Sequence, residues 1–318
     1  SMRDGSLSYL EETARLGSQT LDVSVATAFF VQDEINFGAL TALIGSRVEH
    51  VQTKRDTRMT GDELQRNTTT TLVPGIGINY SVTNDIVVLA GVNRGVTMTG
   101  PGQADDIAPE ESINYEAGFR MKAPIYLEAI GFYSDYTNIK GTCSFSSGCV
   151  GDDIDREFNG GEAEVFGLET SASHTFESGR FSIPISLGYT YTVARFTRET
   201  ESDNPDWGQG LIEAGDPLPY IPQGQASLRM GLAYNKLSTD FNILWKDKLA
   251  DQSVSAGRTV IPSYVITDFN LSYNYNSSGK VYFRVDNIFN KEYITSLRPI
   301  GLRPGKPRAY TVGLKHVF

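Results

Sequence analysis

Long hydrophobic runs are missing from this sequence of 318 residues, which has no stretch of about 18 or more apolar residues. A transmembrane helix needs about 20 such residues, so the sequence excludes one. A transmembrane β-strand needs only about 9–11 residues, in which apolar and polar side chains alternate. A protein built from such strands can therefore have a slightly hydrophilic sequence, as this one does with a mean hydropathy of −0.25.

Positive charge is also scarce. The 28 Lys and Arg residues are outnumbered by 38 Asp and Glu residues, and the formal net charge is −10. Binding along nucleic-acid phosphates needs a basic face, so this balance disfavours that class of function. No basic stretch followed by an apolar segment opens the sequence, so no signal peptide is visible. Ser1 and Met2 look like a cloning remnant, and a secreted protein cut from its upstream residues would look the same.

Cysteine is limited to Cys143 and Cys149, six positions apart in a loop-like segment. In an oxidising compartment they would pair and close a small ring; the alternative is two reduced thiols. No further cysteine or nearby histidine completes a metal site with four ligands. The acidic segment that follows lacks the spacing of a twelve-residue calcium loop, which favours a solvated loop. Its carboxylates are those of Asp152, Asp153, Asp155 and Glu157.

Histidine, the usual general base, occurs only 3 times. His316 shares the alternation of the last apolar strand, and His174 lies near an expected short turn. His50 has no convincing serine or carboxylate partner in the sequence. No nucleophile elbow, P-loop or metal-binding histidine pair is present, so no catalytic residue is assigned and an enzyme is disfavoured.

Alternation of apolar and polar residues with a period of two is the dominant signal, and helical periodicity hardly competes with it. The segment 263–275 illustrates it, because Val265, Phe269 and Tyr273 share one face and Asp268 lies on the other. This pattern predicts an all-β protein. We expect about thirteen strands, at 24–36, 39–55, 69–82, 85–97, 113–123, 125–140, 163–176, 180–197, 224–235, 237–249, 263–275, 279–294 and 306–318.

The connections between these strands alternate between short and long. The short turns are expected near 36–38, 83–85, 124, 177–179, 235–236 and 276–278, and the long polar loops at 56–68, 98–112, 141–162, 198–223, 250–262 and 295–305. Outer-membrane barrels have short periplasmic turns and long extracellular loops. The alternation therefore favours an antiparallel transmembrane β-barrel segment with its long loops outside the cell.

A soluble propeller or sandwich is the alternative for an all-β pattern. Soluble strands usually have about five or six residues, and these have the length of a tilted membrane crossing. Aromatic residues also gather near the expected short turns, as in the girdle of a barrel at the lipid boundary. They are Tyr80, Phe176, Phe181, Tyr234, Tyr273, Tyr275 and Phe318.

An odd number of strands that starts outside the cell does not make a complete single-chain barrel, which normally has an even number and both termini in the periplasm. We therefore expect residues 1–23 to be the end of an extracellular loop, with the cloning remnant, and residues 24–318 to be the C-terminal part of a larger barrel. Unpaired strand edges in lipid are costly, so this segment alone is not expected to form a stable barrel.

Four motifs resemble the strands of TonB-dependent receptors. They are the segment around 93–95, 114–120 (NYEAGFR), 165–170 (VFGLET), and the C-terminal pair 282–293 (YFRVDNIFNKEY) and 305–314 (GKPRAYTVGL) with terminal Phe318. The resemblance implies a 22-stranded barrel with an N-terminal plug, absent here, through which the TonB complex acts. It also implies that the barrel-assembly machinery recognises the last strand through Tyr310, Val312, Leu314 and Phe318.

By this resemblance the full protein would sit in the bacterial outer membrane, among lipid and lipopolysaccharide, and import a ferric chelate such as a siderophore or ferric citrate. Loop lengths and the strand at 165–170 look most similar to the ferric citrate receptor branch. The chelate would be cargo, and no cofactor is expected. The alternatives are a complete smaller porin or adhesin, and a soluble β-structured binding module.

Ferric chelates are usually anionic, so a binding site would use basic side chains at the outer mouth, where arginine can bind in bidentate fashion. Pairing with loop acids or with lipopolysaccharide phosphates is the alternative role for each. The candidates are Arg94, Arg195, Arg298, Arg303, Lys306 and Arg308.

Overall fold

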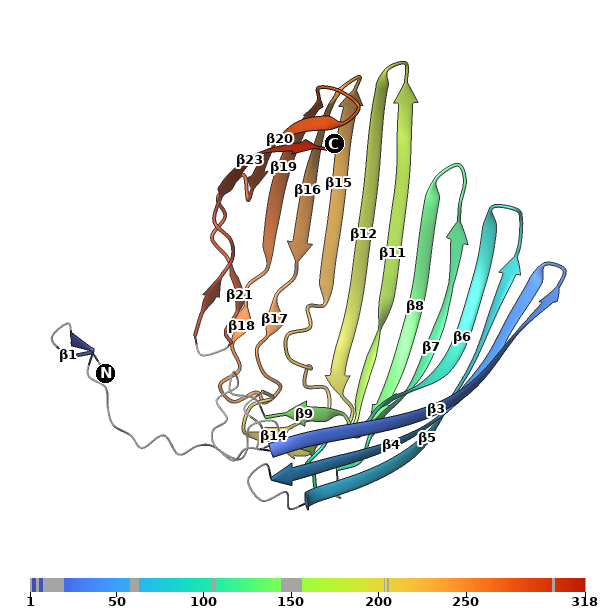
Figure 1. The fold of residues 1–318 in the computed structure, drawn as a ribbon, viewed down its shortest axis with the longest axis vertical. Helices are drawn as coiled ribbons and strands as arrows, with labels where there is room; N and C mark the ends of the chain where they lie inside the picture. Colours follow the sequence, from blue (N-terminus) through green and yellow to red (C-terminus); the bar gives the residue numbers. More distant parts are fainter. Residues whose placement is uncertain are drawn as a thin grey trace.

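The computed structural model describes residues 2–3, 6–7, 20–57, 63–104, 107–143, 156–202, 204, 206–298 and 301–317. Among them no helix is long and apolar enough to cross a membrane. Thirteen strands form one antiparallel sheet, curved as a whole, in which each strand pairs with the next one along the chain (Figure 1). They are β3 (Thr20–Phe37), β4 (Leu40–Thr57), β5 (Glu63–Ser81), β6 (Ile86–Thr97), β7 (Glu110–Met121), β8 (Tyr126–Thr137), β11 (Ala163–Ser178), β12 (Phe181–Phe196), β15 (Gly224–Tyr234), β16 (Leu237–Lys246), β19 (Tyr264–Asn274), β20 (Gly279–Asp286) and β23 (Ala309–His316).

The all-β prediction and the thirteen-strand pattern are confirmed. Short turns join the strands at one end of the sheet, at the top of Figure 1, and the longer loops gather at the other end. Gly38, Gly179 and Asn235 take φ values of +61°, +60° and +52° in three of these turns. Glycine adopts this left-handed backbone without a steric penalty, and asparagine tolerates it better than most residues.

Strand boundaries differ from the prediction at several places. The strand β3 begins at Thr20, and β4 and β5 extend into the expected loop at 56–68. The strand β20 ends at Asp286, eight residues early, because Asn287 and Asn290 take φ values of +49° and +50°, which break the extended backbone. The side chain of the buried Asn287 bonds instead to the backbone of Lys291 and Lys306.

The long loops contain short two-stranded sheets that the sequence does not reveal. Two or three residues are too few for an alternation to be recognised. These pairs are β9 (Lys140–Thr142) with β10 (Glu157–Asn159), β13 (Thr200–Ser202) with β14 (Gly210–Ile212), β17 (Leu249–Ala250) with β18 (Val260–Ile261), and β21 (Ile294–Ser296) with β22 (Arg303–Pro304). A further pair, β1 (Met2–Arg3) with β2 (Ser6–Leu7), lies near the N-terminus.

Strand register places apolar residues beside apolar ones. Leu271, Phe283 and Val312 are direct neighbours across β19, β20 and β23. We call the side that carries them the apolar face; Val312 on it is 75% exposed. The opposite polar face carries Asn270 and Arg284, which are also paired across the strands.

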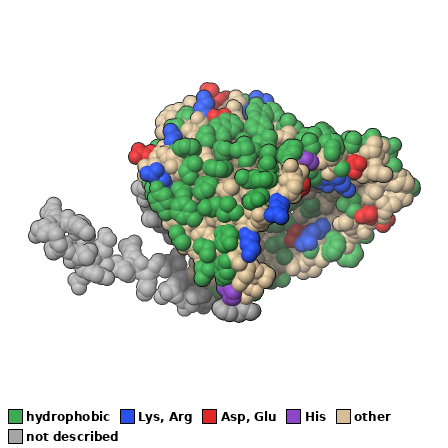
Figure 2. Space-filling model, turned by 90° about the horizontal axis from the view of Figure 1, so that it is seen from above, with side chains coloured by type: hydrophobic (Ala, Val, Ile, Leu, Met, Phe, Trp, Pro, Cys, Tyr) green, Lys and Arg blue, Asp and Glu red, His purple; other side chains and the backbone are tan. Residues whose placement is uncertain are grey.

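Ion pairs cross neighbouring strands on the polar face. Arg120 pairs with Glu128 at 2.5 Å, and Arg229 pairs with Asp240 at 3.0 Å. Figure 2 shows a broad surface of hydrophobic side chains, with charged side chains along its rim and in the hollow beside it. The apolar face is therefore suited to hydrocarbon and the polar face to water.

Aromatic side chains mark both limits of the apolar face. A short-turn row contains the exposed Tyr80, Phe176, Phe181, Tyr234 and Tyr273. A long-loop row contains Tyr115, Tyr133 and Phe166, which are direct neighbours in register across β7, β8 and β11. Phe166 and Phe176 lie ten residues apart on β11, which is about 33 Å along a strand and about 25 Å across a layer at a tilt of about 40°. This equals the height of the apolar band of an outer-membrane barrel.

An arginine on the apolar face midway between the rows tests whether this face meets hydrocarbon. Leu187 on β12 is 45% exposed there and pairs with Leu228. We expect Leu187→Arg to lower the free energy of unfolding in lipid vesicles by about 2–4 kcal/mol, the cost of a cation near the bilayer midplane. Ser171→Arg is the control, because Ser171 lies on the polar face opposite Glu128. Equal effects of the two substitutions on urea-induced unfolding of the full receptor would contradict the assignment of the faces.

Candidate functional site

Long loops pack against one another around an apolar core of their own. Trp207 is at its centre, with its ring edge-on to both Phe158 and Phe196 at centroid distances of 5.2 Å. Phe196 and Ile212 are 1% and 0% exposed, whereas the apolar face of the sheet is largely exposed. We call the loops and small sheets around this core the loop assembly. The buried core residues are Ala163, Ala194, Phe196, Trp207, Ile212, Leu218 and Val254.

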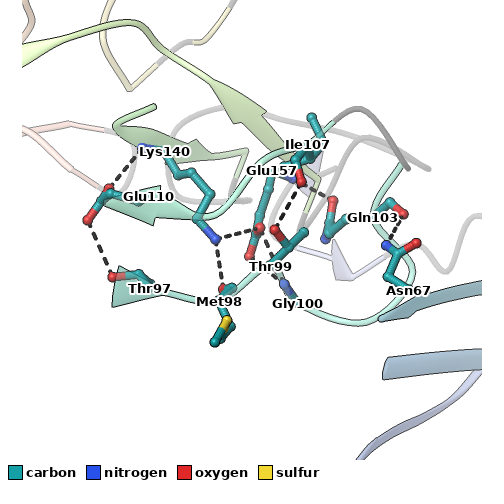
Figure 3. Close-up of polar contacts among 10 residues, drawn as sticks. All are labelled: Asn67, Thr97, Met98, Thr99, Gly100, Gln103, Ile107, Glu110, Lys140 and Glu157. Carbon is teal, nitrogen blue, oxygen red and sulfur yellow. Dashed lines mark hydrogen bonds and ion pairs between the residues drawn. The ribbon is translucent and has the colours of Figure 1, made fainter. Parts of the chain in front are cut away.

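A buried ion pair fastens one side of the loop assembly (Figure 3). The Lys140 side chain, 6% exposed, pairs with Glu157 at 3.1 Å across the β9–β10 sheet. Its ammonium also donates to the carbonyl of Met98 at 2.8 Å, and the Glu157 carboxylate accepts from the Gly100 amide at 3.2 Å. Both charges are thus compensated away from water.

Neighbouring polar groups extend this network (Figure 3). Glu110 accepts hydrogen bonds from the Lys140 amide at 2.9 Å and the Thr97 hydroxyl at 3.4 Å. The Gln103 side chain accepts a hydrogen bond from the Glu157 amide at 2.8 Å. The main-chain carbonyl of Gln103 accepts one from the Asn67 side chain at 2.9 Å. The network joins the loop between β6 and β7, the β9–β10 sheet and the strand β5.

Two arginines join the remaining loops. Arg298 forms an ion pair with Asp206, donates to the carbonyls of Asp206 at 2.7 Å and Asp251 at 3.2 Å, and lies 5.3 Å from the ring centre of Tyr220. These contacts connect the loop after β20 to the loops after β12 and β16. Arg258 adds an ion pair with Asp216 at 2.6 Å. The loops are therefore held in one arrangement by charged and apolar contacts together.

Beyond the aromatic rows, an ion pair also ties the extended strands β3 and β4. Arg55 donates to both carboxylate oxygens of Asp22, at 2.7 and 2.8 Å. These hydrogen bonds and the positive charge hold the pKa of the Asp22 carboxyl below its usual value. The strands keep their pairing well past the apolar band.

Four of the predicted basic residues lie in the last loop, and they have different surroundings. Arg298 forms the ion pair and hydrogen bonds to Asp206 and Asp251 given above. Lys306 pairs with Asp286 and stays 60% exposed. Arg303 is exposed and makes no ion pair with any described residue. Arg308 lies over the ring of Tyr310 at 5.9 Å.

The other two predicted residues are on the apolar face. Val92 is the register partner of Tyr115, and Arg94 lies two residues after Val92, so it shares the same face. Arg195 follows Val193, the partner of Phe166, by two residues. The structure does not bring the six basic residues together at one place, and their roles in ligand binding stay predictions.

A pocket of about 970 Å³ lies beside the last loop. Tyr293 and Leu302 supply apolar surface, and Lys291 and Glu292 supply one charge of each sign. Arg303 and Lys306 flank lining residues in the sequence. The pocket lies in the loop that carries four of the predicted basic residues, and it is the candidate ligand site.

Sequence reasoning missed Lys140 and Trp207. It placed Glu157 in a solvated loop, which is wrong, because the Glu157 side chain is 17% exposed in β10 and pairs with Lys140. For Trp207 a signal was available, because a tryptophan in a long polar loop needs a burial partner. For Lys140 and Glu157 the sequence offers none, since they pair with each other across 17 residues and with backbone groups of Met98 and Gly100 in another loop.

Cysteine and acidic predictions fall largely outside the described residues. Cys143 takes part in a disulfide bond, and the only other cysteine of the sequence, Cys149, lies outside the described part. Asp152, Asp153 and Asp155 lie outside it as well. Within the described ranges no three His, Cys, Asp or Glu side chains gather as a metal site.

Comparison with known families identifies the class of protein. The model of the TonB dependent receptor-like β-barrel matches residues 4–288, which is most of the chain. The chain therefore belongs to this family of outer-membrane receptors and transporters, which is not a family of enzymes. The family differs from the soluble module and the small porin or adhesin that were the alternatives.

Solved structures with this fold include three receptors. The siderophore receptor PiuA from Acinetobacter baumannii has a TM-score of 0.74 at 17% identity, over 94% of this chain and 44% of that one. The ferric-catecholate import receptor Fiu from E. coli K12 has 0.71 at 16%, over 94% and 45%. The ferric citrate transporter FecA has 0.71 at 18%, over 93% and 45%. The chain spans less than half the length of each, and these similar values do not single out the ferric citrate branch.

Loss of the buried Lys140 charge tests the network. Lys140→Ala leaves Glu157 buried without its cation, and we expect a cost of about 3–5 kcal/mol in local stability. The measurement is the rate of limited proteolysis in the loop assembly of the full receptor. Arg198→Ala is the control, because Arg198 pairs with Glu162 while 73% exposed and should cost less than about 1 kcal/mol. Unchanged cleavage in Lys140→Ala would refute a stabilising role.

Proposed function

We propose that the chain is the C-terminal barrel portion of a receptor that imports an anionic ferric chelate, such as a siderophore or ferric citrate. The barrel portion begins with β3 at Thr20, four residues before the boundary predicted at 24, and we propose that the residues before it end an extracellular loop. The observation that carries the proposal is the packed loop assembly at the long-loop end of the sheet. The sheet there has a polar face opposite its apolar face. A preformed mouth binds a ligand without first ordering its loops.

Charge at the last loop supports an anionic ligand. Lys291 lines the pocket, Lys306 is 60% exposed, and Arg303 makes no ion pair among the described residues. Arginine gives bidentate contacts to carboxylates and other planar anions. The chelate is cargo in this function, and no cofactor is required.

Energy for import would come from the TonB complex, acting through a plug domain in the rest of the receptor. Insertion would use the barrel-assembly machinery, which would recognise β23 and the C-terminal aromatic. Tyr310, Val312 and Leu314 are 64%, 75% and 68% exposed on the apolar face, as such recognition requires. Phe318 lies outside the described residues.

Deletion of the whole receptor gene tests the import function. Under iron limitation, we expect the deletion strain to lose uptake of radiolabelled iron from at least one chelate, with ferric catecholates and ferric citrate supplied separately. The cloned gene should restore it. Normal uptake of every chelate by the deletion strain would refute the proposal.

Substitution at the last loop tests the site itself. Arg303→Gln should weaken binding of the transported chelate to the purified receptor roughly tenfold or more, the usual effect of losing a hydrogen bond to a charged group. Arg198→Gln removes a loop cation that is already paired with Glu162 and serves as the matched control. Equal affinities of the two variants in a ligand titration would place the site elsewhere.

A further inference from the structure

Two lysines lie side by side on the polar face at the short-turn end of the sheet, where β20 and β23 pair. Lys280 and Lys315 are directly opposite each other in strand register, and Lys280 shares its face with Arg284 farther along β20. We call the two the lysine pair. Like charges directly opposite each other destabilise a sheet. An anion between the two ammonium groups would offset that cost.

No acid among the described residues neutralises the lysine pair. Both side chains are exposed, and neither ammonium forms an ion pair with a described residue. The same-face neighbour on β19 is the neutral Asn274, and the next row, Ser272 with Tyr282, is neutral as well. On β16, β19, β20 and β23 the first acid on this face is Asp240, two rows from the lysines, and it pairs with Arg229 at 3.0 Å. The charge of the lysine pair is therefore open to a ligand.

The lysine pair lines a hollow of about 450 Å³ at the rim of the sheet, together with Asn274, Asn276 and Ser278. We call this hollow the rim pocket. Its turn is held in place, because the Asn276 side chain accepts a hydrogen bond from the Ser278 amide at 3.0 Å. The Ser278 carbonyl accepts one from the Val317 amide at 2.9 Å. The rim pocket has the size of a small-ligand site, and its described lining offers N–H and O–H donors without a carboxylate.

A second hollow continues from the rim pocket along the polar face. Its volume is about 440 Å³, and Lys280 lines both hollows. Arg229 and Asp240 line the second hollow as an ion pair, and the Arg229 side chain is 63% exposed. Because a guanidinium has five N–H donors, this pairing leaves several of them to a ligand. Cationic groups thus follow one another along the polar face toward the short turns.

Position and chemistry decide which anion can use the rim pocket. The polar face is the side suited to water, and short turns lie in the periplasm in outer-membrane barrels. Cations that line a surface raise the local concentration of anions. Lysine is a compact, strongly hydrated charge on a flexible stem and lacks the planar fork of arginine, so it attracts an anion without fixing its orientation. These properties suit an anionic solute that passes the rim.

We propose that the rim pocket is a second, weaker site for the anionic iron chelate, occupied as the chelate leaves the interior on the periplasmic side. Lys280 and Lys315 would contact its negatively charged oxygens, and the Asn274 amide would donate a further hydrogen bond. This inference rests on the proposed import of an anionic chelate and assigns its exit to the last strands. The candidate ligand site in the last loop lies at the opposite end of the sheet (Figure 1).

Binding by the full receptor purified in detergent tests the rim pocket. The probes are ferric citrate, which is anionic, and the iron complex of acetohydroxamate, which carries no net charge. We expect a weak site that prefers ferric citrate roughly tenfold or more, and Lys280→Gln/Lys315→Gln should weaken it roughly 25-fold, about fivefold for each lost charge contact in water. Equal affinity for the two probes, or full affinity of the double variant, would overturn the proposal.

Matched variants separate the rim pocket from other cations. Lys122→Gln/Arg180→Gln removes two exposed cations from other short turns and should leave the weak site unchanged. Arg303→Gln acts on the pocket of the last loop and should also leave the weak site unchanged. Loss of the weak site in either variant would mean that binding reflects charge in general, and the proposal would be wrong.

A second variant covers the case in which the lysine variant fails to assemble. Asn274→Asp keeps both lysines and places a carboxylate directly opposite Lys280. The affinity of the weak site for ferric citrate should then fall roughly fivefold, because the new charge repels the anion and pairs with the lysine. An unchanged affinity would place the anion elsewhere and refute the site.

Uptake of radiolabelled iron by cells with the full receptor tests the exit role. Both variants should lower the maximal rate severalfold and leave the half-saturating chelate concentration unchanged, because the pocket of the last loop is intact. An unchanged maximal rate would overturn the exit assignment. Failure of the import proposal would give a different result, the absence of uptake by the wild-type receptor.

Discussion

Backbone pairing between neighbouring strands is the constraint on which the rest of this structure depends. In hydrocarbon no water satisfies an exposed amide or carbonyl, so each strand must find its partners in the next one. Pairing fixes register, and a slip of one residue would turn every side chain to the opposite face. The row of Leu271, Phe283 and Val312 shows the register held across three strands. Within the thirteen-stranded sheet, only the outermost strands β3 and β23 have a single partner among the described residues.

A sheet of this kind contributes little core of its own, because its two faces meet two solvents. The tightly buried apolar side chains gather instead around Trp207 in the loop assembly. Ion pairs such as Lys140 with Glu157 and Arg298 with Asp206 connect different loops. They fix the positions of these loops relative to one another more closely than the non-directional apolar core does. The mouth therefore gains its order from contacts between loops, and its shape can differ between receptors while the strands stay the same.

The strands could be predicted because their signal is local, an alternation visible within ten residues. Loop contacts could not, since Arg298 and Asp206 are 92 residues apart and nothing in either segment indicates the other. The face of Arg195 can be recognised in the sequence, because it continues the alternation of Ile185, Tyr191 and Val193. For Arg94 the sequence was ambiguous, as the segment before it is apolar on both sides. Proximity to a loop alone therefore does not predict that a basic residue binds the ligand, because alternation along the strand decides which face carries it.

Arginine therefore has different physical meanings in this chain according to the surface that carries it. On the polar face Arg120 and Arg229 each pair with an acid on the next strand, where water limits the value of the pair. On the apolar face Arg195 pairs with Glu164 at 2.7 Å, where the surroundings of the sheet are less polar. Strand register therefore sets Arg94 and Arg195 apart from Arg120 and Arg229, because neither of the first two lies on the polar face.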